Sequence, residues 1–126
     1  MTLTCPETEK NASAPMNYEP NQRRYPRYEL DTEVSVTVSG MEKRDMRRGR
    51  SLNLNQAGMG GLFVAGWDVG TSVNLEFSVP VSSTLLTVGA VVRSQLGHRY
   101  GFEFVDLSLS QQEIITKACT TLGLLQ

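Results

Sequence analysis

Residues 100–106 read Tyr-Gly-Phe-Glu-Phe-Val-Asp, and this stretch sets the fold class of the chain. Its three aromatic side chains recur at every second position, so they lie on one face of an extended strand. A helix signal follows, because Ser110 and Glu113 have the spacing of a capping box. The next apolar residues recur at helical spacing: Ile115, Ala118, Cys119 and Leu122. We therefore expect a half-buried strand that leads into one amphipathic helix, with Gly123 as its stop.

Upstream of this stretch, the sequence is typical of short β-strands. Alternating or β-branched segments predict strands at residues 34–38, 46–54, 73–79 and 85–93. A glycine-rich turn at residues 58–61 precedes a short apolar run. Short strands at regular spacing, followed by one helix, predict a mainly β protein, a small closed barrel with the helix packed against it.

Length and composition limit the classes of function. The 126 residues fit one domain, which we place at residues 22–126, after a polar tail at residues 1–21 that we expect to be flexible. The net charge of −1 argues against non-specific binding of nucleic acid. The two cysteines, Cys5 and Cys119, do not indicate a disulfide scaffold or a zinc site. Since no apolar run is long enough for a leader or a membrane span, we expect a cytoplasmic protein without membrane insertion.

The segment Gln22-Arg23-Arg24-Tyr25-Pro26-Arg27-Tyr28 directly precedes the first expected strand. Arginine is always charged, binds phosphate through paired hydrogen bonds and stacks on flat rings. Pro26 fixes its own φ and favours an extended residue before it, so we expect an arm and not a helix. Arg23, Arg24 and Arg27 are therefore candidates for binding a phosphorylated, aromatic ligand. The alternative interpretation is a solvated basic linker.

A second candidate motif is Asn53-Leu54-Asn55-Gln56-Ala57-Gly58. An asparagine amide both donates and accepts hydrogen bonds, so it can bind the edge of a guanine base. Gly58 permits a positive φ or a close approach of the backbone to a ligand. Each of the two motifs is weak alone, because residues at such spacings are common by chance.

In this order and context, the two motifs resemble the PilZ domain, the bacterial receptor module for cyclic di-GMP. Arg23 and Arg27 match the Arg-x-x-x-Arg arm of the family, with Arg24 as an extra basic residue. Asn53 and Gly58 match the ends of its Asp/Asn-x-Ser-x-x-Gly motif. The list of candidate ligand-binding residues is therefore Arg23, Arg24, Arg27, Asn53, Asn55 and Gly58.

Asn55 stands where the family usually has serine, and its amide could still bond the ligand or could crowd it. In an alternative register Gly61 is the motif glycine, which would move both asparagines out of place; we favour Gly58 because it keeps both ends of the motif. Residues 91–93 and 100–106 also resemble the closing strands of the family, so the resemblance covers roughly residues 22–122. It implies a six-stranded antiparallel split β-barrel with a C-terminal α-helix.

The resemblance also implies a function. A compact, stacked dimer of cyclic di-GMP would bind to Arg23 and Arg27 through its phosphates or guanine edges, and ordering of the arm would signal to an unidentified downstream protein. Arg93 is a possible further ligand contact, or else a surface charge at the end of a strand. Two alternatives are a degenerate PilZ-like module that binds only protein and a small barrel that binds single-stranded nucleic acid. We expect no cofactor and no metal.

Catalysis has little support in the sequence. His98 is the only histidine, and it lies in an expected turn without candidate metal ligands nearby. No nucleophile is paired with a base, and the glycines at residues 58–61 lack the lysine of a phosphate-binding loop. The basic residues at 43–50 are typical of a solvated hairpin. We therefore expect a binding protein and not an enzyme.

Overall fold

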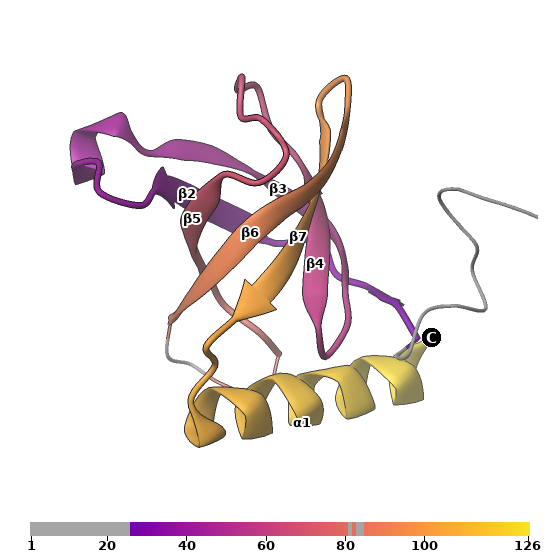
Figure 1. The fold of residues 1–126 in the computed structure, drawn as a ribbon. Helices are drawn as coiled ribbons and strands as arrows, with labels where there is room; N and C mark the ends of the chain where they lie inside the picture. The colour runs from indigo at the N-terminus through magenta and orange to yellow at the C-terminus, as the bar shows by residue number, and fades with distance from the viewer. Residues whose placement is uncertain (1–25, 81, 83–84) are drawn as a thin grey trace, which may run out of the picture.

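The computed structural model describes residues 26–80, 82 and 85–126, so the expected tail at residues 1–21 lies outside the described residues. Figure 1 shows a β-barrel with one long helix across one end. The seven strands are β1 (Tyr28–Glu29), β2 (Glu33–Val38), β3 (Arg47–Leu54), β4 (Gly58–Leu62), β5 (Ser72–Phe77), β6 (Leu86–Leu96) and β7 (Arg99–Val105). A short 3-10 helix, η2 (Lys43–Asp45), precedes β3, and the helix α1 (Leu109–Leu125) ends the chain.

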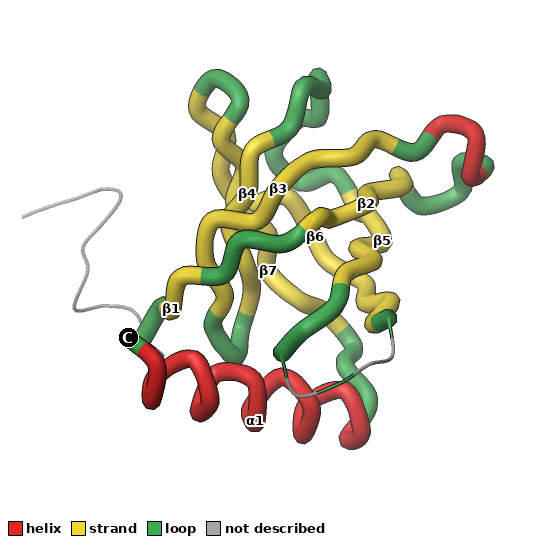
Figure 2. The backbone as a smooth tube through the Cα atoms, turned by 180° about the vertical axis from the view of Figure 1, so that it is seen from behind, coloured by secondary structure: helices red, strands yellow, loops and turns green. Residues whose placement is uncertain are grey.

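Six of the strands form a closed antiparallel ring. The hydrogen-bonded order is β3-β2-β5-β6-β7-β4, and β4 pairs back onto β3. The short strand β1 lies outside this ring and pairs only with β3 among the described strands. Figure 2 shows β1 beside the C-terminal end of α1. The predicted six-stranded barrel with a C-terminal helix is confirmed, and β1 is an outer strand that the sequence analysis did not include.

The core lies inside the ring and between the ring and α1. Alternate residues of β2, β5, β6 and β7 are buried because successive side chains of a strand point to opposite faces. The half-buried Trp67 packs against Phe63 and Tyr100, with ring centroids 5.4 and 5.0 Å apart. Cys119 is a buried residue of α1 in the core, and this desolvation raises the pKa of its thiol to about 11. Cys119 is therefore an uncharged, apolar part of the core at neutral pH.

Strand β4 corrects the prediction at residues 58–61, which we took as a glycine-rich turn before a strand. The glycines are themselves the strand, and Phe63 follows its end. A Cβ on Gly58 would lie 2.0 Å from the carbonyl oxygen of Phe102, and a Cβ on Gly61 would lie 2.7 Å from the ring of Phe63. Glycine is weak in isolated strands, but here only glycine permits this close packing of β4.

The helix begins earlier and ends later than predicted. Ser108 and Gln111 form the capping box, so the predicted box at Ser110 and Glu113 was wrong by two residues. Gly123 is not the stop, because the helix continues to Leu125. The aromatic ring of Tyr28 lies over Gly123, where a Cβ would come within 3.1 Å of it. The predicted buried stripe is confirmed: Ile115, Ala118, Cys119 and Leu122.

Candidate functional site

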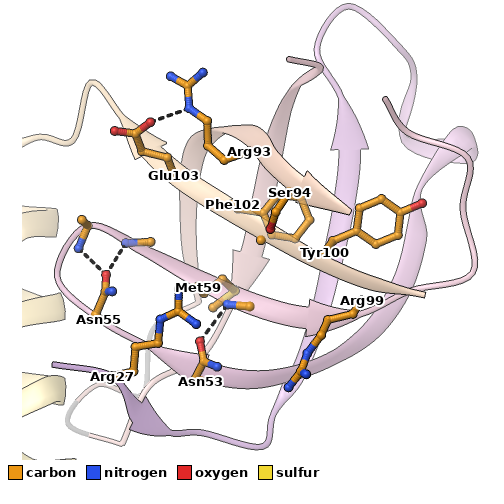
Figure 3. Close-up of a pocket in the computed structure, with 14 residues that line it drawn as sticks. Arg27, Asn53, Asn55, Met59, Arg93, Ser94, Arg99, Tyr100, Phe102 and Glu103 are labelled. Atoms are coloured by element: carbon orange, nitrogen blue, oxygen red, sulfur yellow. Dashed lines mark hydrogen bonds and ion pairs between the residues drawn. The ribbon is translucent and has the colours of Figure 1, made fainter. Parts of the chain in front are cut away.

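A pocket of about 330 Å³ lies on the outer face of β3, β4, β6 and β7 (Figure 3). Five of the seven residues singled out from the sequence line it: Arg27, Asn53, Asn55, Gly58 and Arg93. Arg23 and Arg24 lie outside the described residues. Arg27 of the first motif and Asn53 of the second are 26 residues apart in the sequence. The pairing of β1 with β3 brings the two motifs to one surface.

Two glycines, Gly60 and Gly101, form the middle of the pocket. Tyr100 and Phe102 of β7 are buried in the core, so Gly101 between them faces outward. Gly101 pairs with Gly60 of β4, and Gly60 pairs with Asn53 of β3. We call these two paired glycines the glycine floor. The Oγ of Ser94 lies 2.4 Å from the position that a Cβ on Gly101 would take, and the Oδ1 of Asn53 lies 3.1 Å from that of a Cβ on Gly60.

Asn53 stands at one side of the glycine floor. Its Oδ1 accepts a hydrogen bond of 3.1 Å from the backbone N–H of Gly60. This bond fixes the amide plane, and the Nδ2 group has no hydrogen-bond partner among the residues that the structure describes. Asn53 therefore presents two donor hydrogens at the pocket, which can bind a carbonyl oxygen or a ring nitrogen of a ligand.

The side chain of Asn55 stabilises the turn between β3 and β4 through hydrogen bonds to the backbone. Its Oδ1 accepts hydrogen bonds of 2.7 Å from the backbone N–H groups of both Ala57 and Gly58. Its own N–H donates to the carbonyl of Gly58 at 2.9 Å. Because a serine hydroxyl can accept the same kind of turn bond, Asn55 can replace the serine of the motif as a turn former.

Gly58 lines the pocket, but its backbone does not have a positive φ. A side chain at this position is excluded by the carbonyl of Phe102, which belongs to the neighbouring strand and not to a ligand. The part of the Gly58 interpretation that invoked a positive φ is therefore wrong. The close approach concerns two strands of the barrel.

Arg27 immediately precedes β1, and the segment that follows it is fixed to β3. The hydroxyl of the buried Ser51 donates to the carbonyl of Leu30 and accepts from the N–H of Thr32. Backbone bonds from Leu30 to Leu52 and from Ser51 to Thr32 continue this attachment. The base of the arginine arm therefore has a defined position at the rim of the pocket.

Arg93 lies on β6 at the opposite rim, next to an irregularity in the pairing of β6 with β7. Its Nε is 2.5 Å from Oε1 of Glu103, and both side chains are more than half exposed. Together with Arg27 and Arg99, the lining has three arginines and one glutamate, a net formal charge of +2. The pocket therefore favours an anionic ligand, although Glu103 already pairs with Arg93.

Nine of the fourteen lining residues were not among the candidates from the sequence, and four of these matter for the argument below: Gly60, Arg99, Gly101 and Glu103. The alternation that buries Tyr100 and Phe102 also places their sequence neighbours on the outer face, so part of the signal was present. What the sequence did not provide was the pairing of β4 with β7, whose paired residues Gly60 and Gly101 are far apart in the chain.

The other basic residues of β3 and its turn lie away from this pocket. Three of them form exposed ion pairs: Arg44 with Glu42, Arg48 with Glu33, and Arg50 with Asp31. Exposed pairs of this kind are typical of a solvated strand surface.

Within residues 26–80, 82 and 85–126, no three His, Cys, Asp or Glu side chains are grouped so that they could hold a metal ion. The helix in the described part of the chain is too short and too polar to cross a membrane.

Comparison with known proteins gives one family match and several structural matches. The sequence model of the PilZ domain matches residues 21–120. No curated protein matches the chain in sequence. The PilZ domain of YcgR from Escherichia coli, solved with c-di-GMP, is similar with a TM-score of 0.65 and 16% identity, over 81% of this chain and 92% of that one. The PilZ domain of CeSA from a cellulose-synthesizing bacterium has a TM-score of 0.60 and 16% identity, over 80% and 99%.

A longer protein also matches. The inhibitor of motility MotI/DgrA from Bacillus subtilis has a TM-score of 0.69 and 17% identity, over 83% of this chain. The match covers 53% of MotI, so the chain corresponds to about half the length of that protein.

Proposed function

Because the chain belongs to the PilZ domain family, we propose that it is a receptor for cyclic di-GMP. One observation supports this above the others: Arg27, Asn53, Asn55 and Gly58, from two distant motifs, line one pocket of positive net charge. The same ligand is present in the structure of the YcgR domain, which has the same fold. We also propose that the protein acts by binding and not by catalysis, and that it works in the cytoplasm, where a second messenger is sensed.

The chemistry of the ligand fits the chemistry of the pocket. Cyclic di-GMP has two phosphates and two guanines, so it needs cations, flat surfaces and hydrogen-bond donors. Arg27, with Arg23 and Arg24 of the arm, would bind phosphate oxygens or the O6/N7 edge of guanine. The free donors of Asn53 would bind a guanine edge. Asn55 and Gly58 would keep the turn between β3 and β4 in place.

The proposed output is a rearrangement of the arm that a downstream protein recognises. The arm continues directly into β1, so contacts of Arg27 with a ligand would act on a strand outside the closed ring. A segment that becomes ordered on binding loses entropy, which lowers affinity but provides a switch.

A degenerate module that binds only protein is the second candidate. Two observations favour it: Arg93 is already paired with Glu103, and the Asn55 oxygen is already bonded to the backbone. Such a module would bind its partner equally well with and without the nucleotide.

Isothermal titration calorimetry with cyclic di-GMP tests the proposal. We expect binding by the wild-type protein that weakens with salt, and a loss of about tenfold or more in Arg23→Ala and Arg27→Ala, since a hydrogen bond to a charged group contributes about 1.5–3 kcal/mol. The control is Arg44→Ala, which removes the same charge from a residue paired with Glu42 away from the pocket. The absence of heat and of a thermal shift at ligand concentrations near millimolar would reject the receptor in favour of the protein-binding module.

A further inference from the structure

A second pocket adjoins the first at the side of Asn53. Its volume is about 710 Å³, and it extends between β1, β3 and the end of β4. Three residues line both pockets: Arg27, Asn53 and Arg99. Figure 3 shows Asn53 between the side chains of Arg27 and Arg99. The two arginines therefore line the same two pockets as Asn53, one from the arm and one from the barrel.

Arg99 is the first residue of β7, where its place in the barrel is fixed by two neighbouring strands. It pairs with Leu62 of β4 and with Leu96 of β6. In the alternation of β7 it lies on the same outward face as Gly101. Arg99 thus stands on the rigid ring, at the edge of the glycine floor, and not on the arm.

The guanidinium of Arg99 differs from the other barrel arginines at these pockets. Arg93 is bonded to Glu103 at 2.5 Å, and Arg50 is bonded to Asp31 at 2.9 Å. The guanidinium of Arg99 makes no hydrogen bond or ion pair with any residue in the described part of the chain. Its donors are therefore available to a ligand without the loss of an existing bond.

We propose that Arg99 is a third ligand-binding arginine, which binds the nucleotide from the barrel side while the arm binds it from the other side. The inference rests on the proposed function and extends it to a ligand that occupies both pockets across Asn53. The planar guanidinium matches a pair of acceptors, either two phosphate oxygens or the O6 and N7 atoms of guanine. Because it is held by the barrel, Arg99 can bind the ligand before the arm is in place.

Calorimetric titration with cyclic di-GMP tests this with three variants. Arg99→Ala is expected to weaken binding by about tenfold or more, since a bond to a charged group is lost. Arg99→Lys tests whether Arg99 binds phosphate oxygens or the O6 and N7 atoms of guanine, because lysine keeps the charge but not the planar pair of donors. A partial loss assigns Arg99 to phosphate, and a loss equal to that of alanine assigns it to guanine. Arg47→Ala is the matched control, an exposed arginine of β3 that lines neither pocket.

Stability and binding together decide the outcome. The guanidinium of Arg99 has no protein partner among the described residues, so Arg99→Ala should unfold at the same temperature as the wild type. The control Arg47→Ala should bind within twofold of the wild type. If Arg99→Ala also binds within twofold of the wild type, the inference fails while the receptor function stands. If the wild type does not bind at all, the receptor function fails and the inference fails with it.

Discussion

The side-chain amide of Gln126 forms two hydrogen bonds with the main chain of Glu29. Its Nε2 donates to the carbonyl of Glu29 at 2.7 Å, and its Oε1 accepts from the N–H of Glu29 at 2.9 Å. One side chain thus supplies the donor and the acceptor that a neighbouring strand would supply. This contact joins the end of α1 to β1, the strand that directly follows Arg27.

Replacing Gln126 should therefore loosen β1. In Gln126→Ala both bonds to Glu29 are lost, and we expect the free energy of unfolding to fall by about 1–2 kcal/mol. Hydrogen exchange at the Glu29 amide should become faster. The control is Gln112→Ala, whose side chain reaches only the carbonyl of Leu107 at 3.3 Å. Urea denaturation and exchange measurements that show equal effects for the two variants would contradict this role of Gln126.

The packing of β4 against β7 should not tolerate a methyl group at Gly58. A Cβ there would lie 2.0 Å from the carbonyl oxygen of Phe102, so Gly58→Ala must push two backbones apart. We expect a loss of about 3 kcal/mol or a failure to fold. Gly66→Ala is the matched control, since a Cβ there meets nothing within 4 Å, and it should be neutral or slightly stabilising. A thermal melt of Gly58→Ala that matches the wild type would show that this contact is not rigid.

Asn55 should be replaceable by serine but not by alanine. Its oxygen accepts from the N–H groups of Ala57 and Gly58, and the serine hydroxyl can accept at the same turn. We expect Asn55→Ala to cost about 1–2 kcal/mol and Asn55→Ser to cost about half of that or less. Chemical denaturation measures both. If Asn55→Ser also raises the affinity for cyclic di-GMP strongly, the natural asparagine weakens the site. Equal losses in the two variants would argue against the turn role.

The carboxylate of Glu103 should limit the affinity for an anion. It adds a negative charge to the pocket and holds Arg93 at 2.5 Å. Glu103→Gln is expected to raise the affinity for cyclic di-GMP severalfold in calorimetry, while stability changes by less than about 1 kcal/mol because the pair is exposed. Glu33→Gln is the control, since Glu33 pairs with Arg48 outside the pocket. A weaker affinity in Glu103→Gln would mean that the carboxylate itself binds the ligand.

Most of the barrel could be predicted because its strands alternate clearly. Residues 73–79 and 100–104 place every second side chain in the core, and that period alone identifies the strands. Strand β4 was missed because glycine has no side chain to alternate and a low preference for strands. Strand β1 was missed because its two residues carry no pattern. Among the described residues its position depends on distant partners: β3, Gln126 and Gly123.

Some residues of the candidate site could be predicted from the sequence, and others could not. Arg27, Asn53 and Gly58 belong to local motifs, so the sequence could point to them. Arg99 and Gly101 belong to the site only through the pairing of β4 with β7, and a single sequence does not contain that register. The role of Asn55 in the turn was also hidden, because it depends on where its oxygen points and not on its residue type.

The closed ring of six strands determines where this molecule can move. Each strand of the ring is hydrogen-bonded to a neighbour on both sides, so sliding one strand would break two ladders at once. Strand β1 is joined to the ring on one side, and among the described residues its Glu29 main chain is also bonded to the side chain of Gln126. If the proposed ligand moves the arm, the ring should keep its register, and the contacts of β1 with the end of α1 should be the first to change.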